Sequence, residues 1–195
     1  MKRIAPIAIA LLGGALLLTG CSREAEEKRR IETELRIIRC EAGRWGGADD
    51  FLARLFSDRA QKPEVRRRAA LAMGRIGQPT FLVALQHGLN ASDAELRAAA
   101  LLAIGEILDA ENMGLHGAAP NPAMIEAVHR CRTDPAAIVR ARAVEALGKT
   151  GRLEFLPAPA VIAPDPTRLD EETQQFYARE WIKATARVEQ AAAVP

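Results

Sequence analysis

Apolar and polar residues recur along most of this chain with the period of an α-helix. Three stretches, which begin at Val65, Leu96 and Val139, share one order of residue types: apolar, Arg, two variable residues, Ala, apolar, variable, Ala, apolar, Gly. The apolar residues and alanines of this pattern fall on one face of a helix. Strand-like runs of β-branched residues with period two are absent from the sequence. The pattern therefore predicts an all-α protein.

A second helix is predicted after each of the first two stretches. Pro79 and Pro122 mark the starts, because proline lacks the N–H group that the first turn of a helix leaves unpaired. We expect these helices over residues 79–89 and 122–132. The repetition of helix pairs indicates a solenoid, in which each pair buries its apolar face against its neighbours.

Glycine closes the shared pattern at Gly74, Gly105 and Gly148. A left-handed backbone at the end of a helix is easiest for glycine, so we predict that each of these residues ends the first helix of its repeat. Replacing Gly105 with valine is then expected to lower the thermal stability.

The predicted solenoid covers residues 31–156 and contains three to four repeats. An irregular first repeat is expected, with helices over residues 31–44 and 49–57. Residues 109–121 form an insertion between two repeats. This insertion is either a tolerated surface loop, which we favour, or a loop that binds a partner.

The end of the chain departs from the repeat pattern. Prolines are dense over residues 157–167, which predicts a stiff connector. Residues 168–195 then predict a C-terminal helix that contains Trp181. We favour a cap over the last repeat, because a solenoid needs to cover its terminal apolar face; the alternative is a docking helix for another protein.

The three glycine-ended stretches resemble HEAT repeats, and more closely the short-period HEAT units that are similar to those of phycobilin lyase subunits. This resemblance implies a right-handed α-solenoid of stacked helix pairs, capped by the C-terminal helix. Because one fold serves many roles, it implies no single function.

The first twenty residues carry a different signal. Lys2 and Arg3 precede an apolar, uncharged run that is shorter than a membrane-spanning helix, and Leu18-Thr19-Gly20-Cys21 follows. These residues resemble the leader of a bacterial lipoprotein. The resemblance implies cleavage between Gly20 and Cys21 and attachment of fatty acyl chains, such as palmitate, to Cys21.

The lipoprotein resemblance also implies a location. Residues 1–20 would be the signal peptide and residues 21–30 a short membrane-proximal spacer, so the solenoid would lie close to the lipid surface. Ser22 follows the modified cysteine, where the signal for retention in the inner membrane is usually aspartate. We therefore expect an exported, membrane-anchored protein, at the outer membrane and facing the periplasm in a host with two membranes.

Charge excludes one class of partner. The chain has 27 Lys and Arg residues against 25 Asp and Glu residues, and Lys2 and Arg3 belong to the predicted leader. The remaining chain is formally neutral, whereas nucleic-acid-binding proteins carry a clear basic excess. We therefore expect no nucleic acid among the partners.

An arginine recurs at the second position of each repeat, at Arg66, Arg97 and Arg140. We favour the interpretation that these side chains pair with acidic residues of their own or a neighbouring repeat. The alternative is that they form a basic row that binds an acidic partner. Asp93 and Asp134 precede the second and third stretches and suit both helix capping and such pairing.

Few residues suggest a catalytic, metal-binding or partner-binding role. His87 and His129 lie in successive second helices and could meet on the concave face as partner-binding residues, with His116 in the insertion as a third candidate. His129 and Cys131 point to different sides of a helix, which argues against a shared metal. Cys40 and Cys131 are two repeats apart, too far for a disulfide. We predict no metal, no cofactor and no catalytic site.

The sequence thus favours a non-catalytic scaffold that binds proteins of the cell envelope. The alternative is an accessory or regulatory subunit of an envelope enzyme, because short HEAT units also accompany lyases and prolyl isomerases. We expect no isomerase activity from these residues, because none of them form an isomerase domain after the repeats.

Overall fold

The structure is a computed structural model that describes residues 7–47, 50–109 and 121–150, together with the C-terminal positions 175, 179, 182–187 and 189–190. Side chains are described from residue 23 onward. The chain divides into two units, residues 1–39 and 40–195.

The first unit consists of most of helix α1 (Ile7–Ala42), which continues through the predicted leader and the predicted spacer. Ile31, Leu35 and Ile38 follow one another along this helix as exposed apolar residues. Among the described helices, none combines the length and the hydropathy that are needed to cross a membrane.

The second unit is built from pairs of helices. Its described elements, after the last turn of α1, are α2 (Phe51–Ser57), α3 (Pro63–Ile76), η2 (Pro79–Phe81), α4 (Leu82–Gly88), α5 (Ala94–Leu108), α7 (Pro122–Arg130), η3 (Cys131–Thr133) and α8 (Ala137–Lys149).

The predicted starts of the helices are confirmed. Pro79 opens the 3₁₀ turn that leads into α4, and Pro122 opens α7. The side chain of Asp93 accepts the N–H of Leu96 and so caps α5, as its position predicts. Asp134 lies before the corresponding α8 but does not cap it, because the N-cap residue there is Ala136.

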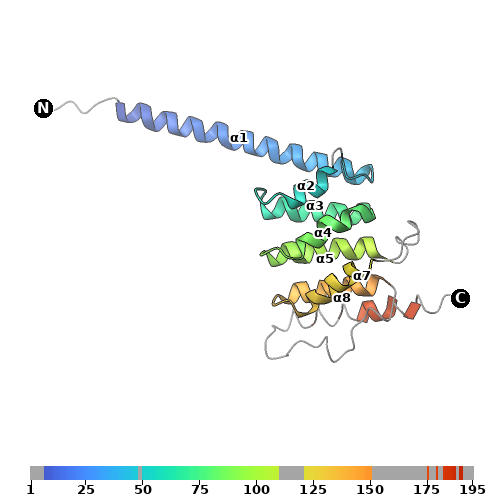
Figure 1. The fold of residues 1–195 in the computed structure, drawn as a ribbon. Helices are drawn as coiled ribbons and strands as arrows, with labels where there is room; N and C mark the ends of the chain where they lie inside the picture. Colours follow the sequence, from blue (N-terminus) through green and yellow to red (C-terminus); the bar gives the residue numbers. More distant parts are fainter. Residues whose placement is uncertain are drawn as a thin grey trace. The chain divides into compact units, whose positions relative to one another are not determined.

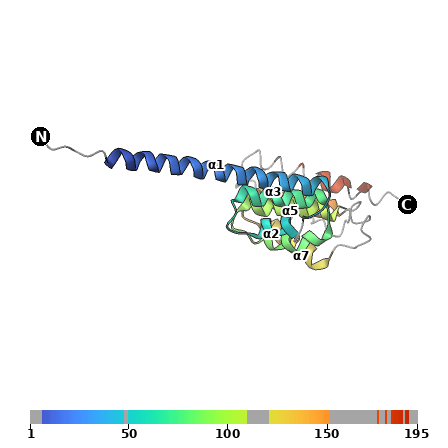
Figure 2. The same cartoon turned by 90° about the horizontal axis from the view of Figure 1, so that it is seen from above.

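The helices form two layers. The first helices of the repeats, α3, α5 and α8, pack against one another in sequence order, and the second helices, α2, α4 and α7, do the same. Figure 1 shows these pairs stacked one below another, and Figure 2 shows α3 and α5 in a different layer from α2 and α7. Each second helix also packs on the first helix of the next repeat. The predicted all-α solenoid is confirmed.

The three repeat glycines do not end their helices, so that prediction is wrong. Gly74 lies inside α3, and Gly105 and Gly148 lie inside α5 and α8. The residue that caps α3 is Gly77, whose φ of 76° is left-handed and whose N–H donates to the carbonyl of Met73.

These glycines instead let the first helices approach closely. A side chain begins with Cβ, and a Cβ on Gly105 would lie only 3.0 Å from the Cα of Ala146 on the next first helix. Backbone atoms cannot move aside as the end of a flexible side chain can, so only glycine fits without displacing a helix. A Cβ on Gly74 would lie 2.8 Å from the Cα of Ala103, and a Cβ on Gly148 would lie 2.6 Å from the Cα of Ala184.

The described part of the C-terminal helix therefore packs like another first helix. Ala184 is fully buried and faces Gly148 as Ala146 faces Gly105, whereas Ile182 is 62% exposed. The connector over residues 157–167, the insertion residues 110–120 and most residues of the C-terminal helix, Trp181 among them, lie outside the described residues.

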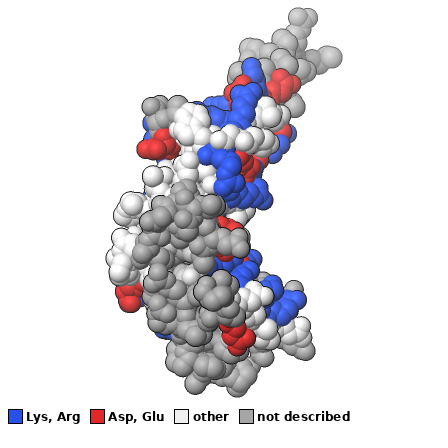
Figure 3. Space-filling view, turned by 90° about the vertical axis from the view of Figure 1, so that its right-hand side faces the viewer, with Lys and Arg blue, Asp and Glu red and all other residues white. Residues whose placement is uncertain are grey.

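Ion pairs connect neighbouring first helices. Glu41 accepts hydrogen bonds from Arg68 at 2.6 Å and from Arg75 at 2.9 Å. The hydrogen bond from Arg68 is the main reason that the pKa of Glu41 lies below its ordinary value. Figure 3 shows acidic and basic side chains lying next to one another on the face that it displays.

A second charged cluster joins α5 to α8. Lys149 is almost fully buried and pairs with Glu106 of α5 and, at 3.1 Å, with Glu145 of its own helix. Glu145 also accepts a hydrogen bond from Arg142. Burial raises the pKa of Glu145, but Arg142 and Lys149 outweigh it, so the pKa is lowered and the carboxylate stays charged.

Candidate interaction surface on the second helices

The recurring arginines connect each repeat to the one before it. Arg66 lies at the start of α3, where its Nε donates to the carbonyl of Phe56 at 2.7 Å. Its guanidinium also lies over the Phe56 ring, with Cζ 5.9 Å from the centroid, near the outer limit of a cation–π contact. Since Phe56 lies in the last turn of α2, Arg66 satisfies a carbonyl that the end of that helix leaves without a helical partner.

Arg97 makes the strongest contacts of the three. Its Nε and Nη2 each donate to the Asp134 carboxylate at 2.8 Å, and its Nη1 donates to the carbonyls of Ala91 and Ser92. The two side chains are only 12% and 11% exposed. This bidentate geometry is the strongest form of an arginine–carboxylate pair, and the hydrogen bonds to Asp134 raise the pKa of Arg97.

Arg140 repeats only part of this arrangement. Its Nη1 donates to the carbonyls of Asp134 and Pro135, at 2.8 and 3.0 Å. All three arginines thus bind backbone carbonyls at the end of a second helix or just after it, and Arg97 alone of them pairs with a carboxylate among the described residues. The recurring arginine is first of all a structural connection between repeats.

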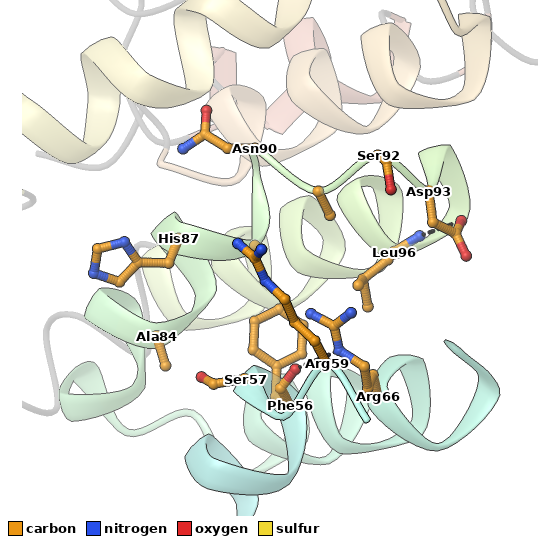
Figure 4. A pocket seen from close by; sticks show the side chains of 12 residues that line it. Phe56, Ser57, Arg59, Arg66, Ala84, His87, Asn90, Ser92, Asp93 and Leu96 are labelled. Atoms are coloured by element: carbon orange, nitrogen blue, oxygen red, sulfur yellow. Dashed lines mark hydrogen bonds between the residues drawn. The ribbon is translucent and has the colours of Figure 1, made fainter. Parts of the chain in front are cut away.

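A cavity of about 480 Å³ opens where α2, α4 and the start of α5 meet. Figure 4 shows Arg59 and Arg66 beside the Phe56 ring, with His87 and Asn90 further out on the side of α4. The residues that line it are Phe56, Ser57, Arg59, Arg66, Ala84, His87, Gly88, Asn90, Ala91, Ser92, Asp93 and Leu96.

A second cavity, of about 420 Å³, lies between α4 and α7 and shares His87 and Asn90 with the first. Arg130 contributes a positive charge to it, and Asp134 a carboxylate that Arg97 neutralises. We call the two cavities together the second-helix groove. It runs past three consecutive second helices.

The groove carries hydrogen-bond donors that the described part of the chain leaves unused. Arg59, His87 and Asn90 are exposed, and no side-chain hydrogen bond ties them to another described residue. By contrast, the Asp93 carboxylate already accepts from the N–H of Leu96 and lies 3.5 Å from Arg67. The free polar groups of the first cavity are therefore mainly donors and cations.

The predicted histidines fall in different places. His87 lines both cavities, and its role in binding a partner stays a prediction. His129 lines neither cavity; it is half-buried on α7, and its pKa is lowered mainly by that burial and further by Arg132. His116 lies outside the described residues. No cluster of three or more potential metal ligands occurs in the described part of the chain.

The two cysteines of the solenoid, Cys40 in the last turn of α1 and Cys131 after α7, are buried and belong to no disulfide. Burial, with a smaller contribution from Asp134, raises the pKa of Cys131 to about 11, so it remains a protonated thiol at neutral pH. Cys21 lies within α1, and its side chain is not among those described.

Sequence reasoning missed most of the groove. Arg59 and Asn90 stand at equivalent positions of successive repeats, just after α2 and α4, and Phe56 occupies the place that His87 holds one repeat later. A comparison of the loops that follow the second helices would have detected this periodicity. The repeat pattern of the first helices is stronger, because these helices are more deeply buried.

The fold and the groove define an α-solenoid with an open polar surface along its second helices, a type of protein that is typical of non-catalytic interaction scaffolds. Residues 34–105 match the HEAT repeats family. The match begins in α1 and ends within α5, and it includes the residues that enclose the first cavity. No curated protein matches the chain.

Proposed function

We propose that this protein is a non-catalytic scaffold that binds another protein in its second-helix groove and is held at a membrane of the cell envelope by lipid on Cys21. The groove supports the binding role, because Arg59, His87 and Asn90 offer donors that the described residues do not use. HEAT repeats over residues 34–105 support the scaffold role. The Leu18-Thr19-Gly20-Cys21 sequence supports the anchor.

Lipid attachment supplies the membrane affinity that a helical array lacks. Each buried methylene group contributes about 0.8 kcal/mol, so one acyl chain binds only reversibly, whereas two or more give stable anchoring. The lipoprotein resemblance implies more than one chain on Cys21. The scaffold would then be confined to the lipid surface, where it meets membrane-bound partners at a high local concentration.

The Cys21→Ser variant is expected to lose the membrane fraction and to remain folded. Serine has no thiol to modify, and residue 21 precedes the first predicted repeat, which begins at residue 31. Fractionation and incorporation of labelled palmitate measure the anchor, and circular dichroism measures the fold. Ser22→Ala, a neighbouring substitution that keeps the thiol, should stay in the membrane fraction. Recovery of Cys21→Ser with the membranes would contradict the anchor.

The binding role is tested by crosslinking in intact cells. A photoreactive amino acid at Asn90, inside the groove, is expected to trap one dominant envelope protein, which mass spectrometry identifies. The matched control carries the same group at Arg75, an exposed residue of the first-helix layer that lines neither cavity. If the Asn90 position traps nothing, or the same mixture as the Arg75 position, the groove is not the binding surface.

The identity of the trapped protein separates the two scaffold roles. An envelope enzyme as the dominant product would assign the protein to an accessory subunit, and a structural or transport protein would assign it to an independent scaffold.

A further inference from the structure

We propose that the second-helix groove recognises an acidic peptide segment, with a carboxylate of the partner held by Arg59 and Arg66 beside the Phe56 ring. This inference rests on the proposed function and specifies the chemistry of the partner. The two arginines lie next to each other in the first cavity (Figure 4).

Arg66 is positioned before any partner arrives. Its Nε bond to the carbonyl of Phe56 and its position over the Phe56 ring hold the guanidinium in the cavity. Its two Nη groups make no hydrogen bond to another described residue. A guanidinium that is fixed in this way loses little side-chain entropy when it binds a ligand.

Arg59 supplies a second cation without a carboxylate of its own. It is exposed in the loop after α2 and forms no ion pair with the described residues. Two neighbouring guanidinium groups repel each other, and an anion between them relieves that repulsion. Two carboxylates lie near this pair of arginines: Asp58 attracts Arg66 but accepts hydrogen bonds from Ala60 and Gln61, and Asp93, which lines the cavity, is engaged by the Leu96 N–H and Arg67.

The lining favours a carboxylate on a peptide over a phosphate group. Two forked guanidinium groups match the planar carboxylate, and Asp93 adds a negative charge that opposes a doubly charged phosphate. Asn90, Ser57 and Ser92 lie nearby and can pair with the N–H and C=O groups of a peptide backbone. The adjoining cavity, with Arg130, gives an extended segment room to continue along α4 and α7.

The test uses the lipidated, detergent-solubilised protein and a fluorescent oligo-glutamate peptide, with oligo-glutamine as the uncharged counterpart. Fluorescence anisotropy should show binding of the glutamate peptide alone, weakening as salt is raised. Arg59→Glu is expected to weaken binding by about tenfold or more, because it replaces an attraction by a repulsion. Arg39→Glu, an exposed substitution outside both cavities, should leave the affinity unchanged.

Arg59 forms no hydrogen bond or ion pair with another described residue. Its substitution should therefore leave the melting temperature unchanged. Equal binding of both peptides, or equal loss in the Arg59 and Arg39 variants, would overturn the inference. So would Arg59-dependent binding to vesicles of anionic phospholipid in the absence of peptide binding. If the Asn90 crosslink persists in cells while oligo-glutamate does not bind, the scaffold role stands and only the acidic chemistry fails.

Discussion

Gly105→Val should lower the melting temperature by about 6–12 °C, because overpacking a helix contact costs about 3 kcal/mol at the upper end and each kcal/mol shifts the melting temperature of a chain of this size by about 2–4 °C. The cause is the approach of α8. A Cβ on Gly105 would already lie 3.0 Å from the Cα of Ala146, and the two γ-methyl groups of valine need still more room. Thermal unfolding followed by circular dichroism measures the effect.

A graded series separates this cause from helix propensity. Gly105→Ala adds Cβ alone and should destabilise less than valine, although alanine in an open helix position would stabilise by about 1 kcal/mol. Ala123→Val places a branched side chain at an exposed position of α7 and should leave the melting temperature nearly unchanged. A higher melting temperature for Gly105→Ala would show that α5 and α8 are not in such close contact.

The Arg97→Ala variant is expected to lose about 3 kcal/mol of unfolding free energy, near the lower end of the cost of breaking a buried ion pair. Arg97 makes two hydrogen bonds to Asp134 and two to backbone carbonyls, and both side chains of the pair are nearly buried. The substitution leaves the Asp134 carboxylate shielded from water with no cation. Urea denaturation measures the loss.

Arg140→Ala is the matched control, since Arg140 occupies the same position one repeat later and bonds only to carbonyls among the described residues. It should cost clearly less. Because repeats are stabilised through their neighbours, amide hydrogen exchange in Arg97→Ala should increase more in α8 than in α3. Equal losses in the two arginine variants would show that the Asp134 pair contributes nothing beyond the carbonyl bonds.

Local features of the fold could be predicted because they depend on residues close in sequence. The period of the apolar residues places the first helices, and Pro79 and Pro122 mark the starts of the second helices without reference to distant residues. The cap that Asp93 provides is equally local, since its carboxylate reaches an N–H three residues later. The lipid anchor on Cys21 stays a prediction.

The glycines show why a pattern can be recognised and its cause mistaken. A helix cap and a close helix contact both favour a residue without Cβ, so Gly74, Gly105 and Gly148 satisfy either explanation when neighbours along the chain are considered alone. The true cap, Gly77, has the stronger local signal, because Pro79 follows it two residues later. The contact became evident only when the next first helix was in place.

The hydrogen-bond partners of the recurring arginines could also be predicted only in part from the sequence. Pairing of Arg97 with an acidic residue of the neighbouring repeat follows the favoured hypothesis. Arg66 and Arg140 bond instead to backbone carbonyls, which every residue possesses and which no sequence pattern can single out.

By itself, the amino-acid sequence determined the helical character, the repeat and the family resemblance, because apolar periodicity records which face of each helix is buried. Only the tertiary structure decided the surface that the repeats present. Arg59, Arg66 and His87 come from the loop after α2, from α3 and from α4, and they line one cavity because α2 packs against both α3 and α4, where Gly88 leaves room for the Phe56 ring. Side chains that are distant in sequence become neighbours only through that stacking.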